Sequence, residues 1–347
     1  MHSIEKSLFK LVPKRISEAI MLRRLGTALP TMATSTPSLV FEHGGQRSRH
    51  RHQVDFARDG DRLLIVLDRD RLASDWELYY MTWRRLPTLV RILSRASREL
   101  TPVSGNISDG GGNLPDELAF CSDEPLAFLV PDPAFMTEHF YQPFRELADS
   151  QPARWHQRRD TLLWRGSISG EGLTITHAMD VDDPALKQRV RLCLALRGLA
   201  DVDVKLLASA RDKSEQQATA AVEAHGLLGA PIAPSRWIDV KFALDIDGPT
   251  NSWANFYTRM LLGCCVLKVA SPSGFRQWYY DDLVAWTHYV PVAADLSDLI
   301  EKVEWCRTHD LACRDIASAG QEFALRRTPE SETVATVERL NERFGAR

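Results

Sequence analysis

The most constraining feature of this chain is a strand–turn–helix–strand segment in its second half. Val240–Asp247 tends toward alternating polarity and predicts a strand. Gly248–Ser252 follows as a turn whose polar residues can cap a helix that begins near Trp253. Cys264–Val269 then predicts a second, buried strand. Because such a turn exposes unpaired backbone N–H groups and the positive end of the helix dipole, we expect an anion site there.

Strands alternate with helices along most of the remaining chain, which predicts an α/β fold with a parallel sheet. A length of 347 residues with 44% hydrophobic content suits two domains, at roughly 100–200 residues per domain. We place the boundary in the polar, proline-led segment 152–159. The predicted parts are an N-terminal segment at 1–30, a first domain at 54–155, a second domain at 160–325 and a C-terminal helix at 326–347.

Composition argues against several partners and cofactors. The formal net charge of −3 lacks the cationic excess that a nucleic-acid partner requires. The six cysteines show neither CxxC nor Cys/His metal spacing, which predicts free buried thiols in a reducing compartment. The sequence shows no signal peptide and no apolar run of roughly 18 residues, so we expect a cytoplasmic protein.

The N-terminal segment has the pattern of a basic amphipathic helix. Its apolar residues fall near one helical face, with lysines opposite and arginines following: Ile4, Leu8, Leu11, Val12, Ile16 and Ile20 against Lys6, Lys10, Lys14, Arg15, Arg23 and Arg24. Such a helix can lie on an anionic surface, here the inner face of a membrane. The alternative is a helix packed on its own domain, or a start broken at Pro13, and the pattern alone does not separate these.

Acidic pairs and histidines are the other candidates for chemistry. Four Asp-x-Asp pairs have the spacing of a metal-chelating sugar-nucleotide site: Asp68/Asp70, Asp180/Asp182, Asp201/Asp203 and Asp245/Asp247. On a strand, Asp245 and Asp247 point to one face, as ligand binding would require. His50 and His52 lack a third metal ligand nearby, so we expect a solvated loop. His288 precedes a predicted strand, which favours a packed, hydrogen-bonded histidine over a catalytic one.

Several motifs in this chain occur in one known family. They are Leu163-Trp164-Arg165-Gly166-Ser167; Asp245-Ile246-Asp247-Gly248 with Asn251-Ser252-Trp253; Leu261-Leu262-Gly263 with Val266-Leu267-Lys268; Gln277-Trp278-Tyr279-Tyr280; Trp286-Thr287-His288-Tyr289-Val290-Pro291-Val292; Asp295-Leu296-Ser297; and Ile316–Phe323. In this order they resemble glycosyltransferase family 90. That family contains capsule-associated fungal xylosyltransferases, Rumi-type protein O-glucosyltransferases and bacterial lipopolysaccharide-modifying enzymes. The resemblance covers roughly residues 114–324.

The resemblance implies two Rossmann-like domains that face a cleft, the GT-B arrangement. It implies an inverting transferase that moves glucose or xylose from a UDP-sugar to a hydroxyl of a cell-surface glycan, such as lipopolysaccharide or a related oligosaccharide. Neither a cofactor nor a chelated metal ion is expected, and the acceptor is a glycan or glycolipid. The alternative is a non-catalytic nucleotide-sugar or glycan-binding protein that retains the fold.

The donor-binding residues follow from the motifs and from phosphate chemistry. Arg165 can contact phosphate bidentately, and the family places a serine at the position of Ser167. We expect the donor site to comprise Arg165, Gly166, Ser167, Lys241, Asp247, Gly248, Asn251, Ser252, Trp253 and Arg259. Rumi-type members have arginines where this chain has Leu173 and Ala254. The phosphate charge must therefore be met differently here, or the donor pocket is altered.

The acceptor hydroxyl needs a general base, which the first domain should supply. Asp123 follows a predicted strand and lies shortly after Leu114-Pro115-Asp116, an element that resembles one preceding an Asp of the family. The spacing is about two residues shorter than in Rumi-type members. We therefore take Asp123 as the first candidate, with Asp132 and Asp116 as alternatives. An Asp beside a proline more often caps a helix or turn.

Overall fold

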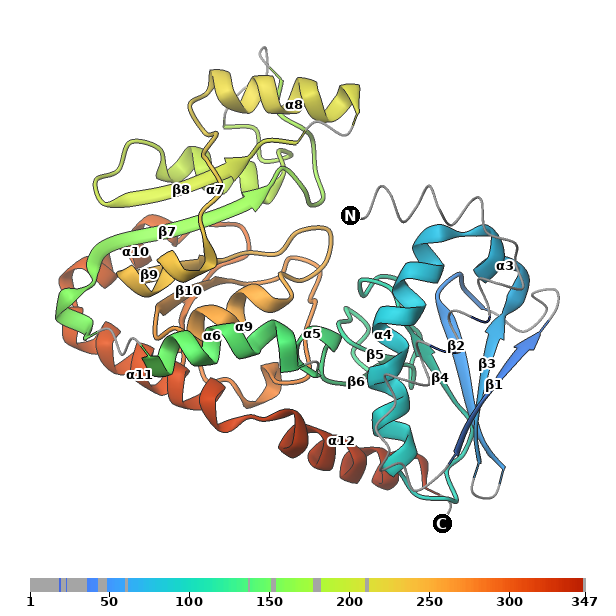
Figure 1. The fold of residues 1–347 in the computed structure, drawn as a ribbon. Coiled ribbons are helices and arrows are strands. Elements are labelled where there is room, and N and C mark those ends of the chain that lie inside the picture. The colour runs from blue at the N-terminus through green and yellow to red at the C-terminus, as the bar shows by residue number, and fades with distance from the viewer. Residues whose placement is uncertain are drawn as a thin grey trace. The chain divides into compact units, whose positions relative to one another are not determined.

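The chain forms two units, each with its own sheet and helices (Figure 1). The computed structural model describes residues 36–42, 49–59, 62–136, 138–150, 154–176, 182–209 and 212–345, with the single positions 19 and 23. The first unit comprises residues 1–137, 276–278 and 328–347, and the second comprises 138–275 and 279–327. Apart from these two positions, the predicted amphipathic segment lies outside the described residues. No described helix is long and apolar enough to cross a membrane.

The first unit contains a mixed sheet of order β1-β3-β2-β4-β5-β6. Its strands are β1 (Thr36–Glu42), β2 (Gln53–Asp59), β3 (Arg62–Asp68), β4 (Val103–Asn106), β5 (Leu118–Ala119) and β6 (Phe128–Leu129). β2 runs antiparallel to both β3 and β4, and the other pairs are parallel. The expectation of a parallel sheet is therefore wrong for this unit, because β2 and β3 are joined by a short connection that has no room for a crossover helix.

The helices described in this unit are α3 (Arg69–Ser74), α4 (Trp76–Arg95), α5 (Pro133–Met136) and α12 (Pro329–Phe344). Asp75 caps α4 by accepting hydrogen bonds from the backbone N–H groups of Glu77 and Leu78. Leu86 and Leu89 of this helix are fully buried. α12 begins with a capping box between Thr328 and Ser331 and packs against α4. The predicted C-terminal helix thus exists and belongs to the first unit.

The second unit contains a wholly parallel sheet of order β11-β10-β9-β7-β8. Its strands are β7 (Arg159–Ser167), β8 (Val202–Leu207), β9 (Val240–Asp245), β10 (Cys265–Val269) and β11 (Val290–Val292). Its helices are α6 (Glu138–Ser150), α7 (Gln188–Leu196), α8 (Lys213–Ala224), α9 (Ala254–Leu261), α10 (Leu299–Thr308) and α11 (Asp310–Arg326), with short 3₁₀ turns η1 (Trp155–Gln157), η2 (Pro234–Asp239) and η3 (Tyr280–Asp282). The predicted strand–helix series is confirmed here.

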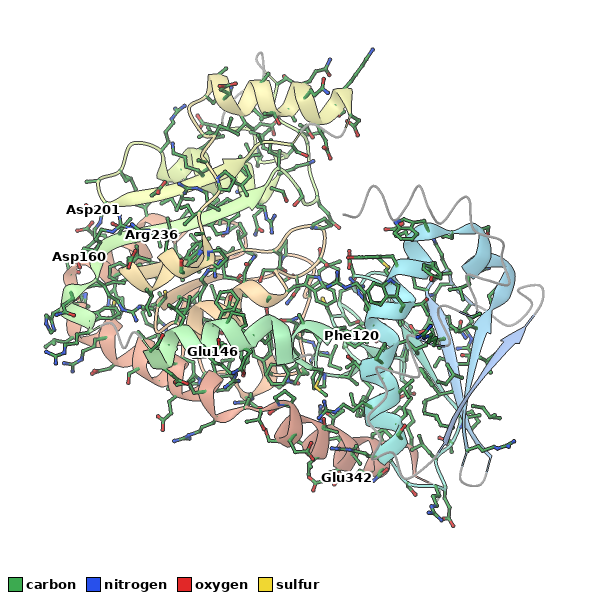
Figure 2. The ribbon with its side chains drawn as sticks, viewed as in Figure 1. Phe120, Glu146, Asp160, Asp201, Arg236 and Glu342 are labelled. Atoms are coloured by element: carbon green, nitrogen blue, oxygen red, sulfur yellow. The ribbon has the colours of Figure 1, made fainter. Side chains whose placement is uncertain are left out.

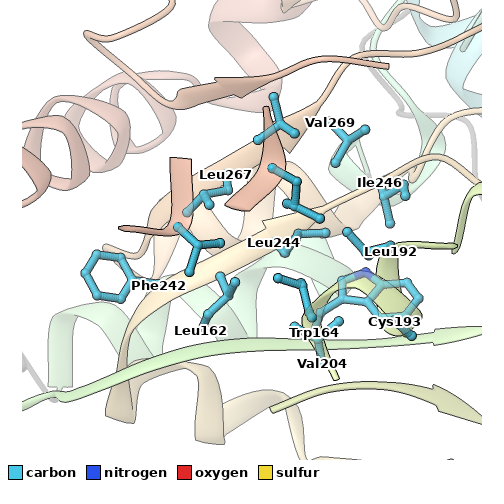
Figure 3. Close-up of a cluster of buried hydrophobic side chains, with 14 of the residues drawn as sticks. Leu162, Trp164, Leu192, Cys193, Val204, Phe242, Leu244, Ile246, Leu267 and Val269 are labelled. Atoms are coloured by element: carbon cyan, nitrogen blue, oxygen red, sulfur yellow. The ribbon is translucent and has the colours of Figure 1, made fainter. Parts of the chain in front are cut away.

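This sheet packs around an apolar core built from alternating strand residues and the inner faces of the helices. Figure 3 shows Trp164, Leu244 and Leu267 of neighbouring strands beside Leu192 of α7. The unit begins at Glu138, earlier than the boundary we expected at 152–159. The reason is that α6 packs against α9, where the rings of Tyr141 and Tyr257 stack with their centres 5.4 Å apart. A buried aromatic contact assigns a helix to a domain more strongly than a polar segment in the sequence does.

Candidate donor site

The order of the second sheet places a switch point between β7 and β9. The chain leaves β7 for β8 on one side and then returns to β9 on the other. In open parallel sheets, ligands bind outside the carboxyl ends of the strands at such a point. Ser167 ends β7, and Asp245 ends β9 shortly before the turn at 248–252. The fold therefore brings two of the predicted donor motifs to one edge.

Arg189 ties these two strand ends together. It is the second residue of α7, and its Nε donates to the Asp247 carbonyl at 2.8 Å and its Nη2 to the Ile246 carbonyl at 3.1 Å. Its Nη1 donates to Ser169 Oγ at 2.9 Å. Burial lowers the pKa of this guanidinium, although the carboxylates of Asp245 and Asp247 favour its charge. Arg189 is thus a buried cation at the predicted anion site.

Glycine is favoured where the two loops meet. A Cβ on Gly248 would lie 3.0 Å from Arg189 Nη2, and one on Gly170 would lie 3.3 Å from the Gly248 carbonyl oxygen. Gly170 also has φ of +110°, which L side chains rarely adopt. Gly166 has a different reason, since its Cβ would lie 2.3 Å from the Trp164 indole. Bulkier residues at these positions would separate the loops or displace the indole.

A buried cluster of Asp245, Asp247 and Lys268, which we call the carboxyl-end cluster, lies beside this junction. Lys268 Nζ is 2.8 Å from Asp245 Oδ2 and 3.2 Å from Asp247 Oδ1, and all three side chains are at most 8% exposed. The prediction that Asp245 and Asp247 share one face is confirmed. Burial opposes the charge of Lys268, but the two carboxylates outweigh it and raise its pKa. Asp245 Oδ1 and Asp247 Oδ2 are buried and accept no hydrogen bond from the described residues, whereas Asp245 Oδ2 contacts Lys268.

The start of α9 supplies further polar groups. Asn251 Oδ1 accepts from the Trp253 backbone N–H at 2.6 Å, and its Nδ2 donates to Tyr280 Oη at 2.8 Å. Trp253 has φ of 55° and ψ of −122°, a strained conformation for a residue with a side chain. Ser252 Oγ is buried and has no hydrogen-bond partner within the described part of the chain. Strain and unused polar groups at one turn are common at binding sites.

An open pocket adjoins these residues within the second unit. It encloses about 360 Å³ of empty space, including open solvent. Its lining residues are Ser169, Gly170, Glu171, Gln188, Asp247, Gly248, Pro249, Ser271, Pro272, Ser273 and Phe275. Asp247 therefore belongs both to the pocket wall and to the carboxyl-end cluster.

Arg165 is used differently from the sequence-based prediction. Its Nη2 pairs with Asp203 Oδ1 at 2.7 Å, and its Nη1 donates to the Asp203 carbonyl at 2.8 Å. Its Nε donates to the Ala230 carbonyl at 2.9 Å. These partners lie on β8 and the segment after α8, so the guanidinium points toward the edge strand. Arg165 is committed to structural contacts, and a phosphate would have to displace them.

Lys241 and Arg259 also lie away from the turn. Lys241 is at the amino end of β9, where its Nζ pairs with Asp160 at 2.6 Å and Asp310 at 2.7 Å. The guanidinium of Arg259 lies 3.5 Å from the centre of the Trp237 ring, and burial lowers its pKa to about 10. The prediction that these two cations contact the donor loop is therefore wrong. Lys241 lies at the opposite end of β9, and Arg259 packs against Trp237.

The candidate bases differ in how they are held. Asp132 is buried and accepts from the backbone N–H groups of Ala134 and Phe135, as expected of a helix cap. Asp116 pairs with Arg343. Asp123 is exposed, and among the described residues nothing hydrogen-bonds to its side chain. Of the three, Asp123 is the exposed carboxylate that is not already paired or used as a cap.

The donor site predicted from the sequence omitted two cations that lie near the turn, Lys268 and Arg189. Lys268 is a lone charge inside a buried strand, a pattern that signals a paired or functional lysine. Arg189 had no local signal, because its role depends on the meeting of α7 with two strand ends. The predicted packing of His288 agrees with the structure, since its Nδ1 accepts from the Val284 N–H at 2.9 Å and its ring lies 4.9 Å from that of Phe323.

Comparison with known proteins defines the class. Residues 185–335 match the family described as Glycosyl transferase family 90. This region contains α7, β9, the turn at 248–252 and β10, and so most of the candidate site. The resemblance seen in the sequence motifs is confirmed, and this part of the chain belongs to glycosyltransferase family 90.

Individual relatives share shorter stretches. Protein O-glucosyltransferase 2 of Danio rerio is 37% identical over 84 residues, which is 24% of this chain and 16% of that protein. Protein O-glucosyltransferase 3 of Homo sapiens is 38% identical over 85 residues, 24% of this chain and 16% of that protein. Protein 179R of Invertebrate iridescent virus 6 is 28% identical over 184 residues, 49% of this chain and 15% of that protein. The chain thus spans less than a fifth of each relative's length.

Among solved structures, HepE of Anabaena in complex with UDP-glucose is 12% identical and covers 58% of this chain and 53% of its own, with a TM-score of 0.35. A glycosyltransferase from Rickettsia africae is 8% identical and covers 65% of this chain and 57% of its own, with a TM-score of 0.38. At these scores the likeness does not define a shared fold.

Proposed function

We propose that the protein is an inverting glycosyltransferase that moves glucose or xylose from a UDP-sugar to a hydroxyl of a cell-surface glycan, such as lipopolysaccharide or a related oligosaccharide. The observation that best supports a donor site in this pocket is the environment of Asp247. Its carboxylate lines the pocket, is 6% exposed and keeps Oδ2 without a hydrogen bond in the described structure. A buried carboxylate oxygen is costly unless it accepts a hydrogen bond, and a ribose or sugar hydroxyl would donate one.

The diphosphate would lie at the turn between Gly248 and Ser252. Backbone N–H groups at the start of α9 and the buried positive charge of Arg189 favour an anion there. Arg189 acts mainly by holding the two loops together, because its N–H groups already donate to protein oxygens. Negative charge that develops on the leaving UDP is then met by fixed dipoles, which need no reorganisation during the reaction. No metal ion or cofactor is required in this scheme.

Asp123 would act as the general base. In a single displacement it removes the proton of the acceptor hydroxyl while the hydroxyl oxygen attacks the anomeric carbon and UDP leaves. This role requires the two units to face a common cleft, as in the GT-B arrangement, which is part of the proposal. The glycan acceptor and a cytoplasmic site, with the N-terminal segment in contact with the inner membrane surface, rest on the family resemblance and the basic pattern of that segment.

A non-catalytic binding protein is the competing function. Ala254 begins α9 and Leu173 is 51% exposed, whereas Rumi-type relatives carry arginines at these positions. Loss of both cations would weaken stabilisation of the leaving group more than it weakens binding of the neutral part of the donor.

Incubating the purified protein with UDP-glucose or UDP-xylose and candidate acceptors distinguishes the two functions. We expect release of UDP together with transfer or slow hydrolysis. Asp123→Asn should lower turnover by roughly 10²–10⁴-fold and leave UDP affinity unchanged. Asp116→Asn serves as the control, because Asp116 is already paired with Arg343. UDP binding without turnover for any donor would favour the binding protein.

A further inference from the structure

Three cysteines that are distant in the sequence meet in the core of the second unit. Cys265 opens β10, Cys306 lies near the end of α10 and Cys313 lies in the first turn of α11. Their Sγ atoms all lie within 4.8 Å of one another, and we call them the three-thiol cluster. Exposure is 0% for Cys265 and Cys313 and 3% for Cys306. The corner between α10 and α11 turns the two helical cysteines toward the same strand.

Burial alone does not distinguish these residues, since all six cysteines of the chain are buried and reduced. A buried thiol ordinarily behaves as a small apolar group, and burial raises the pKa of Cys193, for example, to about 12. What distinguishes the three-thiol cluster is convergence. Among the described residues it forms a group of three metal-ligating side chains with a common centre.

We propose that the three-thiol cluster binds one soft, thiophilic metal ion, of the Zn²⁺ or Cu⁺ class. Metal–sulfur bonds are about 2.3 Å for zinc, so three sulfurs around one ion stand roughly 4 Å apart. The observed limit of 4.8 Å therefore requires only a small inward movement of the side chains. Thiolate ligands select soft ions of this class. Three thiolates can complete the coordination of Cu⁺, whereas Zn²⁺ would take a fourth ligand such as water. Binding releases up to three protons to solvent as the thiols become thiolates.

A pocket lies next to the cluster. It has about 230 Å³ of empty space and is lined by Cys306 together with Asp160 and Asp201, which Figure 2 labels. Asp201 contributes negative charge to its wall, whereas Asp160 is paired with Lys241 and Arg307 lines the same pocket. This pocket is at the amino ends of the strands, whereas the candidate donor site is at their carboxyl ends. The metal would therefore join β10 to α10 and α11 and stabilise the unit without taking part in transfer.

Metal titration of the reduced, chelator-treated full-length protein tests this. Zn²⁺ and Cu⁺ form the two arms, with Cd²⁺ as a spectroscopic probe of thiolate coordination. We expect about one equivalent to bind, a sulfur-to-cadmium absorption band to appear, protons to be released and the midpoint of thermal unfolding to rise. Tight binding in only one arm would identify the ion.

Matched variants assign the site. Cys306→Ser and Cys313→Ser should each lose the absorption band and at least roughly 100-fold in affinity, since one of three ligands is removed. Cys193→Ser should bind as the parent does, because this buried cysteine lies outside the cluster. Should a cluster variant fail to fold, protection of Cys306 from alkylation by bound metal in the parent protein gives the same answer. Absence of binding in both arms, or equal loss in Cys193→Ser, would overturn the proposal.

Discussion

The two ends of strand β9 carry the same set of charges in different surroundings. At the amino end, Lys241 pairs with Asp160 and Asp310, whose side chains are 70% and 49% exposed. At the carboxyl end, Lys268 pairs with Asp245 and Asp247, which are 1% and 5% exposed. We call Lys241, Asp160 and Asp310 the amino-end cluster, and solvent hydrates its two carboxylates.

The difference in burial favours the carboxyl-end cluster as the binding site. An ion pair whose carboxylates are exposed contributes about 0–1 kcal/mol, because water screens it and keeps the carboxylates hydrated, although the Lys241 side chain is only 9% exposed. A buried pair gains Coulomb energy but loses hydration, so it is retained at a net disadvantage unless further hydrogen bonds complete it. The carboxyl-end cluster has two carboxylate oxygens, Asp245 Oδ1 and Asp247 Oδ2, that accept no hydrogen bond from the described residues. A ligand would supply such bonds, and the amino-end cluster has no comparable need.

The largest expected effect is on stability. Lys268→Met leaves two buried carboxylates without their cation and should lower the free energy of unfolding by about 3–5 kcal/mol. Lys241→Met should lower it by at most about 1 kcal/mol, since its carboxylate partners remain hydrated. Urea unfolding followed by circular dichroism measures both. If Lys268→Met does not fold, adding Asp245→Asn should recover folded protein. Equal losses in the two single variants would abolish the contrast between the clusters.

The second expected difference between the two clusters is the effect of a substitution on the affinity for the donor. Asp247→Asn removes a buried acceptor from the pocket wall and should weaken binding of a UDP-sugar by about 1.5–3 kcal/mol, roughly ten- to a hundredfold. Asp160→Asn makes the same chemical change at the amino end and should leave affinity as in the parent. Isothermal titration calorimetry with UDP-glucose gives both constants. Weakening of similar size in Asp160→Asn would mean that general stability, rather than the pocket, sets the affinity.

A third comparison concerns the two arginines. Arg189→Lys keeps the charge but loses the donors that hold the loops together, and we expect about tenfold weaker UDP binding. Arg165→Lys should leave UDP affinity unchanged, because Arg165 is bound to β8. Calorimetry with UDP on the two folded variants decides. The reverse result would restore the assignment made from the Trp-Arg-Gly motif.

The smallest expected effect is on the free energy of unfolding at alkaline pH. Carboxylates raise the pKa of Lys268 above its ordinary value of 10.5. When the pKa of a lysine is higher in the folded than in the unfolded state, its contribution to stability is fully present below the pKa of the unfolded state. That contribution is lost as the pH rises through the pKa of the folded state. Unfolding free energy should thus hold to about pH 10 and fall above it. The Lys268→Met/Asp245→Asn double variant should show a shallower fall than the parent protein, and an unchanged slope would contradict this origin.

Local pattern was sufficient for much of the second unit. The strand at Val240, the turn at Gly248 and the start of α9 within one residue of Trp253 were all predicted, because alternation and turn chemistry act within a few residues. The first unit was predicted less well. Its antiparallel β2 depends on pairing with β3 and β4, and strand direction leaves no mark on a single strand's sequence.

The sequence by itself determined that an anion-suited turn follows a buried strand and that this part of the chain belongs to a family of glycosyltransferases. Only the tertiary structure decided which charges meet there. Strand order places Arg189 and Lys268 at the turn and sends Arg165 to the edge, and the same packing gathers Cys265, Cys306 and Cys313. The physical reason is that burial and charge pairing depend on spatial neighbours, which long-range strand pairing sets and local periodicity does not contain.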